Sequence, residues 1–237
     1  MATERSSKRP SSVARGATPR PGRDAGRTQA SILAAATHEF AQYGLGGARV
    51  DRIAARAGAN KRMLYYYFGN KDDLFLAVLE RVYADIRAAE QGLSLLDGTP
   101  VSGVRRLVEF TWRYFIAHPE FLTLLNSENL HHASHLKRSR HVRAMNSTLI
   151  DTLAELLRRG RRAGVFRGGI DPLQLYISIA ALAYFFLSNS HTLSAVFGRD
   201  LFSPAERKAR LAHMTAMVLG FLAAPQPATK ARPASGG

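Results

Sequence analysis

The sequence predicts an all-α protein with an N-terminal three-helix domain and a larger C-terminal helical domain. Apolar residues recur at intervals of three and four residues from about residue 28 onward. Glycine, proline and N-capping residues divide this pattern into segments of helical length. With 46% hydrophobic residues in a chain of 237, the composition supports a sizeable buried core.

The charge and the absence of cysteine limit the possible partners. There are 33 Lys and Arg residues against 18 Asp and Glu, which gives a formal charge of +15 and points to a polyanionic partner. Charge alone does not separate nucleic acid from an anionic membrane. The lack of cysteine excludes disulfides and thiolate metal sites, and it suits a cytoplasmic protein.

The two ends of the chain lack apolar periodicity. Residues 1–27 are rich in Ser, Pro, Gly and Arg, and we expect a disordered basic arm that attracts phosphates. The alternative is a solubilising tail. Residues 225–237 are expected to be a disordered tail. No export signal is visible, and the apolar run at 175–187 is shorter than the roughly 20 residues that span a bilayer. We therefore expect a buried helix there and no membrane partner.

Residues 28–74 contain the signals of a helix-turn-helix. A first helix is expected from Thr28 to about Tyr43. The second carries apolar residues at i, i+3, i+4 and i+7, namely Val50, Ile53, Ala54 and Ala57. Gly58 ends that helix, and Asn60 is a suitable N-cap for the next one. Asn70 and Asp73 form a variant capping box for a fourth helix over residues 71–96.

The helix that follows Asn60 has two different faces. Leu64 and Phe68 are four residues apart and are expected to pack inward, whereas Lys61, Arg62, Tyr65 and Tyr66 lie mostly on the other side. Three successive aromatic residues cannot all face inward, so the run is more than a packing feature. A basic and aromatic face of this kind suits a helix in a DNA major groove.

Residues 28–74 resemble the N-terminal domain of the tetracycline-repressor (TetR) family of bacterial transcription regulators. The resemblance rests on Ile32, Leu33, Ala35, Ala36, Phe40 and Gly44 in the first helix, and on the spaced residues Ile53, Ala54, Ala57, Gly58, Leu64, Tyr65, Tyr67, Phe68, Lys71 and Leu74. It implies that Lys61 and Arg62 face base edges. It also implies that Tyr65, Tyr67 and Lys71 hold the DNA backbone.

One position departs from the family pattern. Arg49 stands where the family usually has Thr, which removes a helix cap, although a guanidinium suits the same phosphate. The predicted DNA-binding residues are Arg49, Lys61, Arg62, Tyr65, Tyr66, Tyr67 and Lys71.

Residues 75–224 are expected to form an effector-binding and dimerisation domain. The predicted helices cover about 101–117, 119–130, 136–164, 172–190 and 204–223. The last two are apolar on nearly all sides, so they must be covered on all sides. We expect a homodimer through these helices and a palindromic operator in double-stranded DNA. The alternative is a monomer that buries both helices deeply.

The effector pocket is predicted from a cluster of aromatic residues and histidines with a few polar atoms. The candidates are Trp112, Phe115, His118, His131, His135, Tyr176 and Tyr184. Each residue taken alone also fits an ordinary helical core. His131 and His135 are four residues apart, but no carboxylate or thiolate joins them at a familiar metal-binding spacing, so we expect no metal and no cofactor.

The function predicted from these features is a dimeric transcriptional repressor released from DNA by a small molecule. A ligand-dependent activator of the same fold stays open, because the sign of regulation depends on where the operator lies. A sequence-indifferent basic DNA-binding protein would not need the large apolar C-terminal region. We do not expect an enzyme, because the sequence has no phosphate loop, nucleophile elbow or motif-placed carboxylate pair.

Overall fold

A computed structural model describes residues 21–224, and in this range the chain is almost entirely helical, which confirms the all-α prediction. Its elements are α1 (Pro21–Gly47), α2 (Val50–Arg56), α3 (Lys61–Phe68), α4 (Lys71–Gln91), α5 (Pro100–Ala117), α6 (Pro119–Leu130), the 3₁₀ turn η1 (Leu136–Arg138), α7 (Arg140–Arg162), α8 (Pro172–Ser188), α9 (Ser190–Phe197) and α10 (Pro204–Leu222). The tail predicted at 225–237 and most of the predicted arm lie outside the described residues.

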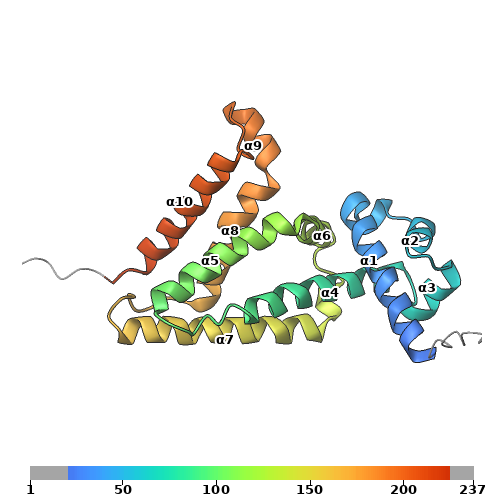
Figure 1. Ribbon diagram of the computed structural model, residues 1–237, viewed down its shortest axis with the longest axis horizontal. Coiled ribbons are helices and arrows are strands. Elements are labelled where there is room, and N and C mark those ends of the chain that lie inside the picture. The colour runs from blue at the N-terminus through green and yellow to red at the C-terminus, as the bar shows by residue number, and fades with distance from the viewer. Residues whose placement is uncertain (1–20, 225–237) are drawn as a thin grey trace, which may run out of the picture.

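The helices form an elongated molecule with α1, α2 and α3 grouped at one end (Figure 1). Helix α4 leaves that group and runs into the body beside α7, so it belongs to both parts. Helix α5 contacts α7, α8 and α10. Helices α8, α9 and α10 rise from the body beside α5, across the long axis of the molecule, with α9 at the tip (Figure 1).

Local sequence signals fix the helix-turn-helix as expected. Gly58 adopts a left-handed φ of 63° after α2, a conformation that glycine reaches without steric cost. Asn60 caps α3 by accepting a hydrogen bond from the backbone N–H of Met63 at 2.9 Å. Asn70 caps α4 in the same way at Asp73, and its side-chain amide donates to the Asp73 carboxylate at 2.6 Å. Both short connections are therefore held at defined angles.

Several helix boundaries differ from the predicted ones. Helix α1 begins at Pro21 rather than Thr28. Helix α4 ends at Gln91 instead of continuing to residue 96, because Arg106 donates to the carbonyl groups of Ser94 and Asp97 and stabilises a loop there. The segment 136–164 is divided at Ser139, which caps α7. Helix α9 was not predicted.

The joint between the two parts of the molecule is a buried contact among α1, α4 and α6. The rings of Phe40 on α1 and Phe75 on α4 meet edge to face at 5.0 Å, and Phe75 meets the ring of His135 at the same distance. Leu45 after the bend in α1 donates its backbone N–H to the Ser127 hydroxyl of α6 at 3.4 Å. We call this contact the interdomain joint.

A single carboxylate organises the loop at the joint. Glu128 is 1% exposed and accepts hydrogen bonds from the backbone N–H groups of His135 and Leu136, both at 2.9 Å, and from His135 Nδ1 at 2.7 Å. These bonds hold residues 131–136 against α6, where His132 and Ala133 have left-handed φ angles. The loop conformation therefore depends on Glu128.

Replacing Glu128 with Ala should destabilise the fold by roughly 3 kcal/mol, because several buried donors lose their acceptor at once. Urea denaturation measures the change. Glu120→Ala is the matched control on the same helix, since that half-buried carboxylate contacts His118 at the surface and should change stability little. Equal losses in the two variants would contradict the role of Glu128.

Candidate DNA-binding surface and effector cavity

The outward face of α3 is the main candidate for a nucleic-acid interface. Lys61 and Arg62 are exposed in the first turn, and Tyr65 and Tyr66 are 46% and 83% exposed. Leu64 and Phe68 on the opposite face are buried, as expected. Helix α3 lies at the end of the molecule opposite to the body (Figure 1). Two cations and two aromatic hydroxyl groups are thus presented to solvent from one rigid helix.

Tyr67 and Lys71 lie at the border of this face and are less free. Tyr67 is partly buried and packs edge to face against Tyr66 and Phe68, with ring centroids 5.2 and 6.5 Å apart. Lys71 is half-buried, and its Nζ lies 3.5 Å from the Gly46 carbonyl oxygen. A lysine in this position can reach a neighbouring phosphate only by leaving a long, weak hydrogen bond.

Arg49 is the N-cap residue of α2 but its side chain does not cap the helix, and its own backbone N–H donates to Glu39 of α1. The buried Glu39 carboxylate accepts from the Arg49 backbone N–H at 2.9 Å and from Arg52 Nε at 2.7 Å. Burial alone would raise the pKa of Glu39, but the hydrogen bonds from Arg52 and Arg49 outweigh it and lower this pKa. The sequence pattern did not single out Glu39.

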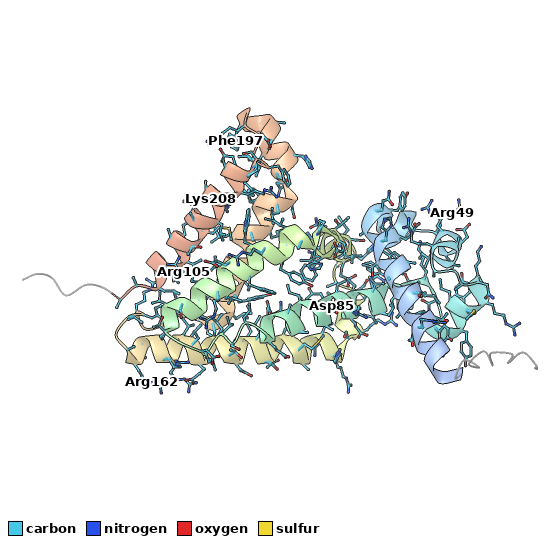
Figure 2. The ribbon with its side chains drawn as sticks, in the orientation of Figure 1. Arg49, Asp85, Arg105, Arg162, Phe197 and Lys208 are labelled. Carbon is cyan, nitrogen blue, oxygen red and sulfur yellow. The ribbon has the colours of Figure 1, made fainter. Side chains whose placement is uncertain are left out.

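The guanidinium of Arg49 is already paired in this structure. Its Nη2 lies 2.8 Å from Asp51, and the hydrogen bond from Arg49 lowers the pKa of Asp51 to about 2. Figure 2 shows Arg49 at the outer end of the α1–α3 group. A phosphate contact by Arg49 would have to compete with Asp51.

This arrangement defines the class: a helix-turn-helix protein with an exposed, cationic second helix. Family models agree. A model of the bacterial regulatory proteins of the tetR family matches residues 32–78, and a tetracyclin repressor-like C-terminal domain model matches residues 100–218. The chain belongs to the TetR family of transcription regulators.

Individual relatives support the same assignment. The HTH-type transcriptional repressor NicS of Pseudomonas putida is 40% identical over 191 residues, which cover 81% of this chain and 89% of that protein. The repressor SCO4008 of Streptomyces coelicolor is 42% identical over 113 residues, or 47% of this chain and 55% of its own. The crystal structure of the putative regulator SCO4942 from S. coelicolor matches with a TM-score of 0.63 at 26% identity, covering 84% and 99% of the two chains.

The family assignment carries a functional class. TetR-family regulators are non-enzymatic proteins that bind DNA and small-molecule effectors and act as dimers. The chain is accordingly a DNA-binding transcriptional regulator. Among residues 21–224, no single helix has the length and apolar composition to cross a membrane. Only α8 and α9 taken together do, and they are bent by 66°.

The residues predicted for the effector pocket are spread through the C-terminal domain. Trp112 and Phe115 are buried in the core, where they pack on Phe186 and Phe121. The Tyr184 hydroxyl donates to Asn126. The remaining predicted residues, His118, His131, His135 and Tyr176, lie at other positions in this domain.

The three predicted histidines do not share one site. His118 is half-exposed with Nδ1 3.0 Å from Glu120, His131 is exposed, and His135 is buried against Glu128. The rings of His131 and His135 are 5.9 Å apart. In the part of the chain that the structure describes, no three His, Asp or Glu side chains gather as a candidate metal site.

A cavity between α4 and α7 contains charged residues that the sequence pattern did not indicate. It has a volume of about 260 Å³, and Arg87 and Glu90 of α4 line its inner wall, each 4% exposed. Of the predicted pocket residues, Tyr176 comes nearest, since its hydroxyl accepts from Arg87 Nη2 at 2.8 Å. An Arg and a Glu at i and i+3 on a helix usually indicate a solvent-exposed pair, so their spacing gave no sign of burial.

Glu90 should make stability depend on pH. Burial raises the pKa of this carboxyl from 4.5 to about 7, more than the nearby Arg87 lowers it. A raised carboxyl pKa means that the folded state binds more protons than the unfolded state between these values. The contribution of the Glu90 carboxyl to the free energy of unfolding is therefore complete below pH 4.5, and it is lost as the pH rises through 7.

Glu90→Gln should therefore remove a pH-dependent loss of stability. Between pH 4.5 and 7, the difference in unfolding free energy between wild type and variant should change by roughly 3 kcal/mol, with the variant gaining as pH rises. Denaturant titrations at pH 5, 6, 7 and 8 measure it. A constant difference would show that the Glu90 pKa is not raised.

Proposed function

We propose that this regulator is a repressor of chromosomal genes that binds a palindromic operator as a homodimer and leaves it when a small molecule binds the C-terminal domain. The exposed face of α3, with Lys61, Arg62, Tyr65 and Tyr66, is the observation that carries the proposal. The two relatives described above are both named repressors, which favours repression over activation.

The residues of α3 would divide their tasks between bases and phosphates. Lys61 and Arg62 stand in the first turn, where their long side chains extend toward guanine O6 and N7 in a major groove. Tyr65 and Tyr66 carry exposed hydroxyls suited to phosphate oxygens. Tyr67, Lys71 and Arg49 would add phosphate contacts at the edges, and Arg49 would exchange Asp51 for phosphate.

Helices α8 and α10 would form the dimer interface. Their exposed side chains include Leu173, Ile177, Phe185, Met217 and Phe221, each about half exposed in the single chain. Phe185, Met217 and Phe221 line a mostly apolar groove of about 470 Å³ between the two helices. A second copy related by a two-fold axis would cover this face and place two α3 helices on one side of the DNA.

Substitutions on α3 and at the first residue of α4 should separate base reading from phosphate binding. Lys61→Ala and Arg62→Ala should reduce the preference for operator over random DNA, by roughly 1–3 kcal/mol for a lost bidentate base contact. Tyr65→Phe and Lys71→Ala should weaken binding to both DNAs equally. Fluorescence anisotropy at several salt concentrations measures both effects.

The matched control for these variants is Lys208→Ala, an exposed lysine on α10 far from α3 (Figure 2). It should leave operator affinity unchanged. If all four variants lost affinity for operator and random DNA in the same ratio, the assignment of Lys61 and Arg62 to base edges would be wrong.

If α8 and α10 form the dimer interface, charged side chains introduced there should prevent dimerisation. The double variant Phe185→Glu/Phe221→Glu would bury two carboxylates between the copies, so sedimentation velocity should show a monomer and operator affinity should fall. Leu130→Glu is the control, because Leu130 is 81% exposed and belongs to α6, not to the two helices of the proposed interface. A dimer that survives the double variant would place the interface elsewhere.

Helix α4 would transmit the signal between the two sites. It begins one residue after its cap Asn70, beside α3, and its far end lines the cavity with Arg87 and Glu90. A ligand acts only through its different affinity for the two arrangements of α4. Footprinting of the intergenic regions beside the gene, combined with a transcription reporter, tests repression directly; increased transcription on binding would instead indicate an activator.

A further inference from the structure

The pair Arg87–Glu90 has an unusual hydrogen-bonding state for buried charges. Arg87 Nη1 and Glu90 Oε2 are 2.8 Å apart, but the contact lacks hydrogen-bonding geometry. Among the described residues, Arg87 Nε, Arg87 Nη1 and Glu90 Oε2 are buried side-chain atoms without a hydrogen-bond partner. Two donors and one acceptor are therefore unsatisfied at one place.

Such a pair is difficult to explain as a device for stability. Buried polar atoms are nearly always hydrogen-bonded, and a buried ion pair is often no more stabilising than an apolar pair of similar volume. The hydrogen bond from Arg87 Nη2 to the Tyr176 hydroxyl orients the guanidinium but leaves Nε and Nη1 unused. A binding site requires donors and acceptors that are held in place and have no partner within the protein.

The rest of the cavity limits the size and character of a ligand. Its volume of about 260 Å³ is just below the roughly 300–1,000 Å³ of most small-molecule pockets, so the ligand must be small. Leu95, Met145 and Leu149 provide apolar contacts, while Thr148 and Thr152 of α7 add hydroxyl groups. The exposed residues Gln91, Ser94 and Asp97 also line the cavity, so the Asp97 carboxylate belongs to its solvent-exposed part. This wall suits a compact apolar skeleton with one polar end.

We propose that this cavity binds a small organic carboxylate that has an N–H or O–H donor beside the carboxylate. The carboxylate oxygens accept hydrogen bonds from the unpartnered N–H groups of Arg87, and the neighbouring donor binds Glu90 Oε2. Arginine suits this task because its planar guanidinium matches a carboxylate. The inference rests on the proposed effector response, since it names the chemical class of that effector.

The experiment uses 2-aminobenzoate, benzoate and 2-aminobenzamide as probes and the full-length protein. The acids should raise the melting temperature at millimolar concentration, 2-aminobenzoate more than benzoate, whereas the neutral amide should not. The double variant Arg87→Met/Glu90→Met should melt at or above the wild-type temperature and should not respond to either acid. Asp85→Asn, on the same helix and paired with Arg81, is the control that keeps the wild-type response.

A second variant keeps the test valid if the double variant does not fold. Glu90→Gln preserves the shape of the side chain and leaves Arg87 without its counter-charge. At pH 8, where the wild-type Glu90 carboxyl with its pKa of about 7 is ionised, benzoate should therefore bind the variant roughly tenfold more tightly than wild type. Equal responses to 2-aminobenzoate and 2-aminobenzamide, a response retained in the double variant, or unchanged benzoate affinity in Glu90→Gln would each overturn the proposal.

Operator binding without ligand separates this inference from the proposed function. If wild type binds its operator but the acids neither bind the cavity nor weaken the complex, the ligand class is wrong and the regulator assignment stands. If wild type binds no operator while the acids still stabilise it through Arg87, the site is confirmed and the proposed repressor mechanism fails.

Discussion

The buried contact among α1, α4 and α6 is the constraint on which the rest of the structure depends. An isolated helix as short as α3 is unstable in water, so its position is set by what it packs against. Its buried residues Leu64 and Phe68 join the same core as Phe40 of α1 and Phe75 of α4. Phe75 in turn contacts His135, which Glu128 holds on α6. The face of α3 that we propose binds DNA is therefore oriented by the contact with the C-terminal domain and not only by its own three helices.

Helix α4 connects this joint to the cavity. Its first turn carries the Asn70 cap and Phe75 nearby, and its last turns carry Arg87 and Glu90. Since one continuous helix cannot bend freely between these points, a change in how Arg87 and Glu90 pack against α7 would be transmitted to the joint in the proposed mechanism. In the proposed dimer, the exposed apolar faces of α8 and α10 would fix the dimer axis, and a small rotation of each chain would then change the spacing of the two α3 helices.

Local signals made the DNA-binding half predictable from sequence. Gly58, Asn60 and Asn70 act within a few residues of themselves, and the structure shows each in the expected turn or cap. The cavity was not predictable, because the burial of Arg87 and Glu90 depends on α7 and α8, far away in the chain. Glu39 was missed for the same reason: a carboxylate in the middle of α1 reveals nothing locally about its contact with Arg49. The predicted aromatic pocket residues Trp112 and Phe115 show the converse, since core and pocket share the same residue types.

The most direct test of the central claim measures how firmly the joint holds α3. The chain has no cysteine, so a single spin label at Ala55→Cys, on the exposed side of α2, reports one distance between the two copies of a dimer by pulsed electron paramagnetic resonance. We predict one narrow distance distribution for the otherwise unaltered protein and a broad one when Glu128→Ala is added. An equally narrow distribution in both would contradict the claim that the joint sets the position of the DNA-binding helices.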